Sequence, residues 1–329
     1  MPMPYPDNET MSVTVADLRF DFFAIGTHFA ELSFGGFGSA SPSRDWQPAP
    51  TDIIIVELRK AFNIQPDTEY KEQFYSPANV AEQHDYAANW TLQILADGTE
   101  VITTMFLRGP IKAAQVRFNN TRAQMYVEPE VPHTRAMPPY VFPLFNLFLS
   151  RVLLRRGGFL IHSSVVCMGI GKGLLFTAPS GTGKTTIANL FANLSRSVVI
   201  NDDMVAIRPP KREGGQPRAY NIPTYRYKQK PASTTLKAAF ALSQADHNIL
   251  LPITSPSQIV AELLANTVQQ PINAWNCDTI ARNVWQCFGS IHSYRLAFEP
   301  SGEVVKMVRK LVAELSRPPR RRSAINNDQ

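Results

Sequence analysis

The stretch APSGTGKTT at residues 178–186 decides the fold class that the sequence predicts. It fits the pattern of a phosphate-binding loop (P-loop), except that Ala178 stands where the pattern has its first glycine. An apolar run at 173–178 leads into it, a helical pattern at 184–194 follows, and another apolar run occupies 197–200. Strand, glycine loop, helix and strand in this order predict an α/β protein.

The loop residues suit the phosphates of a nucleotide. Glycines let successive backbone N–H groups turn toward phosphate oxygens, and the start of the following helix adds the positive end of its dipole. In this pattern the lysine reaches the β- and γ-phosphates, and the threonine after it binds Mg²⁺. The predicted nucleotide-binding residues are Ser180, Gly181, Thr182, Gly183, Lys184, Thr185 and Thr186. We therefore expect ATP and Mg²⁺ as cofactors, against the alternative of a plain glycine-rich turn before a helix.

Two adjacent carboxylates, Asp202 and Asp203, close the apolar strand that follows the predicted helix. A parallel neighbouring strand would place them near Thr185 and the γ-phosphate. One carboxylate could hold Mg²⁺ and the other could accept a proton from an attacking hydroxyl. We assign Asp202 to the metal together with Thr185, and which aspartate acts as base stays open. The alternative is an ordinary turn at the end of a strand.

His162 lies in the stretch LIHSS at 160–164, in a predicted strand upstream of the loop. By itself, a histidine in an apolar strand is more often a core residue than a catalytic one. Together, however, residues 161–164, the loop and Asn-Asp-Asp at 201–203 resemble the catalytic domain of HPr kinase/phosphorylase. Its nucleotide-binding core is shared with ATP-dependent phosphoenolpyruvate carboxykinase. The resemblance implies that His162 faces the transferred phosphate and that the aspartate pair handles metal and proton.

The resemblance is carried by specific motifs over residues 159–208 and extends more loosely over 291–315. The preceding half, which opens on VADLR at 15–19, is similar to standalone HPr-kinase-like proteins found beside peptide-modification genes. The glycine-rich signature of true HPr kinases and the substrate motif of carboxykinases do not follow the aspartates, so neither HPr nor oxaloacetate is implied as a substrate. Residues 220–223 stand where relatives have an aromatic and proline segment near the acceptor. Arg226 is a further candidate there, against the more common alternative of an exposed structural arginine.

Short alternating runs separated by turn residues predict a smaller, mostly β lobe at 1–136. Asp97-Gly98 and Asn119-Asn120 indicate two hairpins, and the Gly/Ser/Pro-rich stretch 35–50 indicates a loop. A helical pattern at 139–156, with an apolar stripe typical of core packing, opens the predicted catalytic domain at 137–317. Further helices are expected at 255–268, 278–291 and 302–316, with a strand at 293–298. Residues 318–329 are expected to form a disordered basic tail.

Composition sets outer bounds on function. Hydrophobic residues make up 44% and charged residues 18% of the 329, which is typical of a globular protein with a sizeable core. The net charge of +6 suits an anionic ligand, but four arginines of the excess lie at 317–322. The three cysteines lie far apart in the sequence and lack the CxxC or Cys/His spacing of a metal site, which predicts reduced thiols in the cytoplasm. Neither a signal peptide nor a membrane span is expected.

The sequence thus predicts an α/β kinase that transfers the γ-phosphoryl group of ATP to a hydroxyl, such as that of serine, on a peptide or small molecule. The predicted catalytic residues are His162, Lys184, Asp202 and Asp203. One alternative is a carboxykinase-type or phosphorylase reaction on the same core, and another is a regulator or scaffold that binds a nucleotide without transfer. Nucleic-acid binding is disfavoured because basic and aromatic residues do not interleave. Whether the protein forms a homo-oligomer stays open.

Overall fold

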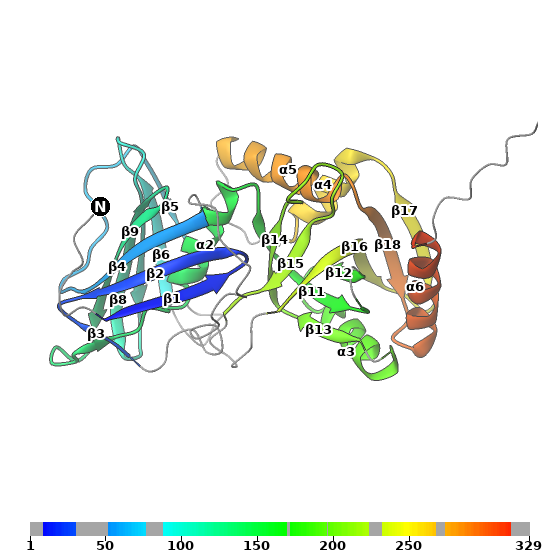
Figure 1. Cartoon of the computed structure of the whole chain (residues 1–329), viewed down its shortest axis with the longest axis horizontal. Coiled ribbons are helices and arrows are strands. Elements are labelled where there is room, and N and C mark those ends of the chain that lie inside the picture. Colours follow the sequence, from blue (N-terminus) through cyan, green and yellow to red (C-terminus); the bar gives the residue numbers. More distant parts are fainter. Residues whose placement is uncertain are drawn as a thin grey trace, which may run out of the picture.

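Two large mixed sheets and five helices of the described chain build an α/β protein (Figure 1). The computed structural model describes residues 9–30, 52–76, 88–169, 172–195, 197–223, 232–267 and 274–316. Three predictions lie outside these residues: the loop at 35–50, the tail at 318–329, and Arg226. No helix in the described part of the chain is long and apolar enough to cross a bilayer.

The first sheet has eight strands in the order β1-β2-β4-β9-β8-β7-β6-β5, and β3 pairs separately with β10. Buried and part-exposed residues alternate along strands such as β2, because successive side chains point to opposite faces of a sheet. The strands are β1 (Thr10–Val15), β2 (Leu18–Ile25), β3 (His28–Phe29), β4 (Ile53–Lys60), β5 (Glu72–Tyr75), β6 (Ala88–Ile94), β7 (Glu100–Phe106), β8 (Ile111–Asn119), β9 (Arg122–Pro129) and β10 (Ala136–Met137). The expectation of a mostly β first part is confirmed.

Tight turns connect neighbouring strands of this sheet. Both predicted hairpins are confirmed: β6 and β7 turn through Gly98 at φ 80°, and β8 and β9 through Asn120 at φ 50°. A third hairpin joins β1 to β2 through Ala16 (φ 54°) and Asp17 (φ 58°). Positive φ at both central residues is typical of the two-residue turn that matches the twist of paired strands.

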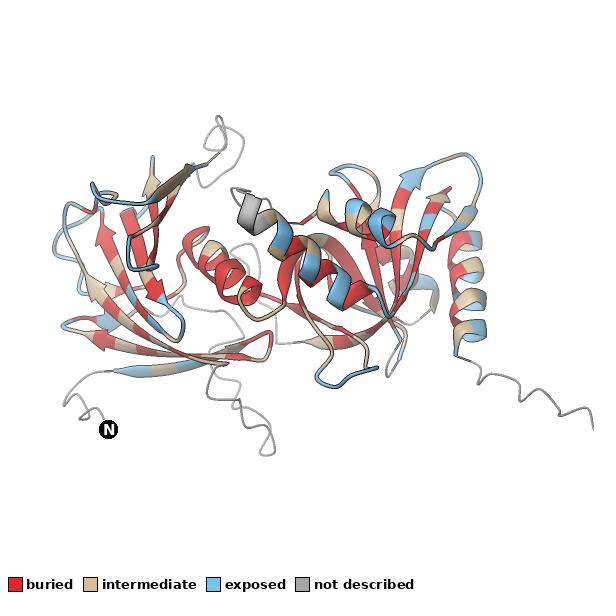
Figure 2. Ribbon diagram, turned by 90° about the horizontal axis from the view of Figure 1, so that it is seen from above, coloured by how far each residue is buried: buried red, intermediate tan, exposed pale blue. Residues whose placement is uncertain are grey.

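Helix α2 (Leu144–Leu154) lies between the two sheets and is buried along almost its whole length (Figures 1 and 2). Its Phe145 and Phe148 rings contact Phe20 of the first sheet edge-on, at centroid distances of 5.3 and 5.7 Å. Arg151 forms an ion pair at 2.5 Å with Glu100 of β7. The helix is shorter than the predicted 139–156 because Pro143, its N-cap residue, precedes the first helical turn.

The second sheet follows the order β12-β11-β14-β15-β16-β18-β17, and β13 also pairs with β11. Strand β11 pairs antiparallel with β12 and with β14, whereas β16 pairs parallel with β12 and with β18. The strands are β11 (Phe159–Cys167), β12 (Gly173–Thr177), β13 (Val198–Asn201), β14 (Met204–Arg208), β15 (Arg218–Asn221), β16 (Ser233–Gln244), β17 (Ile249–Ile253) and β18 (His292–Phe298). β14 to β17 have no counterpart among the sequence predictions.

Helices cover both faces of the second sheet (Figure 2). On one face, α3 (Lys184–Ser195) and α6 (Gly302–Leu315) bury Phe176 and Phe240. On the other, α4 (Pro256–Leu264) and α5 (Ala274–Phe288) bury Leu175 and Ala239. Neighbouring residues such as Leu175 and Phe176 thus enter different cores, as the alternation of side chains along a strand requires.

The two parts of the chain share one core at their junction. The same buried cluster contains α2, the first sheet, three residues of the second sheet (Leu160, Ala206 and Tyr220) and Ile222, which follows β15. The Tyr220 hydroxyl also donates a hydrogen bond of 2.6 Å to the Asp17 carboxylate. The division into domains at 1–136 and 137–317 stays a prediction. Helix α2 belongs to the predicted second domain, but it packs against the first sheet.

Candidate functional site

The glycine loop (residues 178–183) connects the fully buried strand β12 to helix α3. Gly181 and Gly183 have φ angles of 80° and 103°, which side-chain-bearing residues rarely adopt. A Cβ atom on Gly183 would lie 3.0 Å from the Phe298 ring. Ala178, by contrast, is 2% exposed and packs in the core around Phe176, so this position accommodates a methyl group where the pattern has glycine.

Hydrogen bonds from strand β16 and within the loop itself fix the backbone of the glycine loop. Gln244, the last residue of β16, donates a hydrogen bond of 3.3 Å to the carbonyl of Gly181. Within the loop, the Thr182 N–H donates to the Pro179 carbonyl at 3.4 Å, and the Ile187 N–H donates to Gly183 at 3.0 Å as the helix begins. The shape of the loop is therefore set by its own backbone hydrogen bonds, by β12, which leads into it, and by the end of β16.

Lys184, the first residue of α3, folds back onto the loop. Its Nζ donates hydrogen bonds to the carbonyls of Ala178 (2.8 Å) and Pro179 (3.0 Å), and the residue is only 6% exposed. Burial lowers the pKa of Lys184, and the charge of Asp203 raises it in part. The positive charge of Lys184 is thus incompletely compensated, which favours an anion beside it.

Asp202 and Asp203 occupy the turn between β13 and β14. Asn201 shapes this turn: its side-chain oxygen accepts from the Asp202 N–H at 2.9 Å, and its amide donates to the Met204 carbonyl at 2.6 Å. β13 pairs antiparallel with β11, which also pairs antiparallel with β12, so β13 runs parallel to β12 with β11 between them. This topology brings the turn to the same end of the sheet as the glycine loop.

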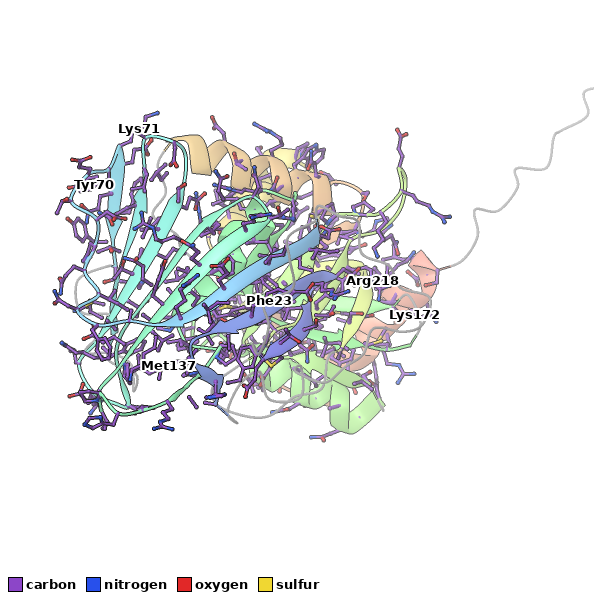
Figure 3. The ribbon with its side chains drawn as sticks, turned by 60° about the vertical axis from the view of Figure 1, so that its left-hand side comes forward. Phe23, Tyr70, Lys71, Met137, Lys172 and Arg218 are labelled. Carbon is purple, nitrogen blue, oxygen red and sulfur yellow. The ribbon has the colours of Figure 1, made fainter. Side chains whose placement is uncertain are left out.

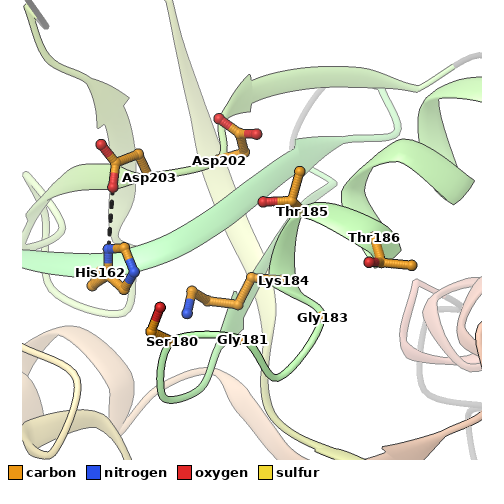
Figure 4. Close-up of a pocket in the computed structure, with 9 residues that line it drawn as sticks. All are labelled: His162, Ser180, Gly181, Gly183, Lys184, Thr185, Thr186, Asp202 and Asp203. Atoms are coloured by element: carbon orange, nitrogen blue, oxygen red, sulfur yellow. Dashed lines mark ion pairs between the residues drawn. The ribbon is translucent and has the colours of Figure 1, made fainter. Parts of the chain in front are cut away.

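His162 is the last residue of β11 that pairs with β14, and pairing with β12, on the other side of β11, begins at the next residue. Its Nδ1 lies 3.3 Å from Oδ1 of Asp203, and the two side chains are 40% and 43% exposed. Figure 4 shows the ring with this nitrogen toward Asp203 and with the other nitrogen on the side of Ser180 and Lys184. The histidine therefore reaches the same space as the glycine loop.

These three segments enclose a pocket of about 430 Å³ (Figure 4). Thr182, a predicted binding residue, does not line it. Residues 220–223 do not line it either; Tyr220 and Ile222 are buried at the junction with the first sheet. The lining residues are His162, Ser180, Gly181, Gly183, Lys184, Thr185, Thr186, Asp202 and Asp203.

The pocket offers few protein ligands to a metal ion. Among the described residues, no group of three or more His, Cys, Asp or Glu side chains could hold one. Thr185 and Asp202 contribute a hydroxyl and a carboxylate to the pocket lining. These oxygen donors fit Mg²⁺, which is usually held by one or two protein oxygens with phosphate oxygens and water completing the shell.

Asn201, Gln244 and Phe298 were not predicted as site residues. Asn201 stands in the Asn-Asp-Asp run, which is a sequence signal for a side-chain-stabilised turn. Gln244 and Phe298 carry no such signal, because they reach the loop only through strand pairing far along the chain. No protein-family model matches the chain, and a comparison with curated proteins finds no significant match.

Proposed function

We propose that the protein is an ATP- and Mg²⁺-dependent kinase of the HPr-kinase-like group. It would transfer the γ-phosphoryl group to a hydroxyl, such as that of serine, on a peptide or small molecule. The observation that carries the proposal is the meeting of His162, Lys184 and the Asp202-Asp203 turn in one pocket beside the glycine loop. The proposal includes a P-loop core of the kind shared by HPr kinase and ATP-dependent phosphoenolpyruvate carboxykinase, supported by the direct succession of β12, loop and α3.

The triphosphate would lie on the glycine loop and the start of α3. Backbone N–H groups at a helix start and the positive end of its dipole favour phosphate there. Lys184 would exchange its two carbonyl acceptors in the loop for phosphate oxygens. Because burial makes its charged form costly, a bound phosphate would restore the pKa of Lys184 toward its ordinary value. The exposed hydroxyls of Thr185 and Thr186 add further donors at the first turn of α3.

Thr185 and Asp202 are the residues that would hold Mg²⁺. The ion would neutralise charge on the phosphate oxygens during transfer. Asn201 would keep Asp202 in place, since it fixes the backbone N–H of that residue. Phosphoryl transfer requires little else from the protein than positioning and charge stabilisation, which this residue set can supply.

His162 and Asp203 lie on the side of the pocket where the acceptor hydroxyl would enter. The Asp203 carboxylate could take the hydroxyl proton, and His162 would steady the phosphoryl group or the acceptor. Both side chains are partly exposed, so a peptide or small molecule can reach them from solvent. The described cysteines are free, which suits our further proposal that the protein works in the reducing cytoplasm.

The test is phosphate transfer to a panel of serine-containing peptides and small hydroxyl compounds, followed by mass spectrometry. The protein is incubated with ATP and Mg²⁺, and Lys184→Ala and Asp203→Asn are compared with Lys172→Ala. Lys172 (labelled in Figure 3) is a matched control because it is exposed, and it precedes β12 at the opposite end of that strand from the glycine loop. Transfer should survive only in the wild type and the control. Transfer that persists in both site variants would refute the proposal, and ATP binding without transfer would favour a regulator.

A further inference from the structure

We propose that His162 is itself a phosphoryl acceptor. Its Nε2 atom would take the γ-phosphoryl group from ATP to form a phosphohistidine, and the hydroxyl acceptor would then take the group from the histidine. This inference rests on the proposed kinase function and divides the transfer into two displacements. It also assigns Asp203 a second task, which is to orient the nucleophilic ring.

The backbone around His162 is held on both sides. The His162 N–H donates to the Asn266 carbonyl at 2.9 Å, and its carbonyl accepts from the Thr177 hydroxyl at 3.3 Å. The next residue, Ser163, donates its N–H to the Asp203 carbonyl at 3.0 Å. The histidine and the aspartate therefore keep their relative position through the backbone as well as through their side chains. A nucleophile held in this way loses little freedom on reaching its transition state.

The contact with Asp203 decides which ring nitrogen can react. The Asp203 Oδ1 atom lies 3.3 Å from Nδ1, and a negative carboxylate beside this nitrogen favours the neutral tautomer that carries its proton on Nδ1. The lone pair then lies on Nε2. Figure 4 shows this second nitrogen on the side of the pocket that contains Ser180 and Lys184. The nucleophilic atom thus faces the place where the phosphates would bind.

The positive charge of Lys184, in the same pocket, suits the leaving group. Lys184 and the glycine loop belong to a different segment from His162 and line the same pocket. They would hold the β-phosphate, which carries the new charge when the bond to the γ-phosphorus breaks. Asp203 would stabilise the positive charge that develops on the imidazole ring, as a carboxylate does for a catalytic histidine generally.

The two steps balance in atoms and charge. In the first, Nε2 forms a bond to the γ-phosphorus while the bond to the β,γ-bridging oxygen breaks, and ADP leaves. The ring keeps its Nδ1 proton and becomes a cationic phosphoimidazole. In the second step, the acceptor oxygen forms its bond to phosphorus, the nitrogen–phosphorus bond breaks, and His162 returns to its neutral form. The hydroxyl proton passes to the Asp203 carboxylate and then to solvent.

The experiment uses the full chain with γ-³²P-labelled ATP and Mg²⁺ and no acceptor. Phosphoramidates resist alkali and hydrolyse in acid, unlike serine phosphate, so the label should be alkali-stable and acid-labile. The wild type and His292→Gln should carry it, and His162→Gln should not. His292 is the control because it is exposed at the start of β18 and outside the pocket lining. Asp203→Asn should slow labelling roughly 100-fold, because the neutral amide no longer stabilises the positive charge that develops on the ring.

Two measurements on the wild type keep the test independent of variant folding. Labelled ADP should exchange into ATP without an acceptor, and transfer from chiral γ-thiophosphate ATP should retain configuration because two inversions occur. Hydroxyl transfer with inversion would overturn the phosphohistidine and leave the kinase proposal standing. ATP binding with neither label nor exchange would also overturn it. If transfer to every acceptor is absent as well, the proposed function fails together with it.

Discussion

Replacing Gly183 with alanine tests whether the glycine loop depends on the side chain beneath it. Gly183 has a φ of 103°, and an added Cβ atom would lie 3.0 Å from Cζ of Phe298. The Phe298 ring is 2% exposed and packs in the core that α3 and α6 share, so it cannot move aside into solvent. The variant therefore combines an unfavourable backbone angle with a steric contact at the loop.

The two costs can be separated with Gly181→Ala. Gly181 has a φ of 80°, but nothing lies within 4 Å of a Cβ atom there. Its variant should lose only the backbone term, about 1–3 kcal/mol of the free energy of unfolding. Gly183→Ala should lose that amount and an overpacking term of about 1–3 kcal/mol more. The difference between the two variants therefore isolates the contact with Phe298.

Urea unfolding of both variants gives the free energies, and Mg²⁺-ATP titration gives the effect on the loop. Phe298→Leu should partly relieve the steric term in combination with Gly183→Ala, with a favourable coupling energy of about 0.5–3 kcal/mol. It should give no such coupling with Gly181→Ala. Equal destabilisation by the two alanine variants, or the absence of coupling between positions 183 and 298, would refute the reasoning.

Three further predictions concern the framework around the site. Glu100→Gln should lower the free energy of unfolding by about 3–5 kcal/mol in urea, because Arg151 would keep a charge that is 2% exposed and lose the negative carboxylate of Glu100 beside it. Burial raises the pKa of Asp17, but hydrogen bonds, including one from Tyr220, outweigh it and lower the pKa overall. This stabilisation is present above about pH 4 and is lost as pH falls through the folded-state pKa. In urea titrations, Asp17→Asn should therefore lower the free energy of unfolding by about 1–2 kcal/mol at pH 7 and by progressively less below pH 4. An equal loss at both pH values would contradict this prediction. Asn201→Ala should cost about 1–2 kcal/mol by loss of the turn's hydrogen bonds and weaken Mg²⁺-dependent ATP binding, which calorimetry can measure.

Local patterns predicted the parts of the fold that depend on local interactions. The two hairpins, strand β12, helix α3 and helix α6 all follow from turn residues, apolar runs and periodicity that lie within each segment. The glycine loop was predicted for the same reason, because its chemistry requires certain residues in consecutive positions. The pocket lining includes the predicted residues His162, Lys184, Asp202 and Asp203.

The sequence could not show contacts that depend on distant strand pairing. β16 begins with alternating residues but continues as an alanine-rich run, which favours a helix as readily as a strand. Its pairing with β12 joins residues such as Phe176 and Phe240, far apart in the chain. The contact of His162 with Asp203 likewise depends on the register between β11 and β14. Sequence reasoning placed both residues near a phosphate but gave no reason for them to touch.

The most direct test of the central claim is a titration of Mg²⁺-ATP into the wild type, Lys184→Ala and Lys172→Ala. Loss of charged hydrogen bonds to phosphate should raise the Kd of Lys184→Ala roughly 10- to 100-fold. The Kd of Lys172→Ala should equal that of the wild type, and omission of Mg²⁺ should weaken binding in both. An unchanged Kd in Lys184→Ala, or no binding of ATP to the wild type, would contradict the assignment of this pocket to a nucleotide.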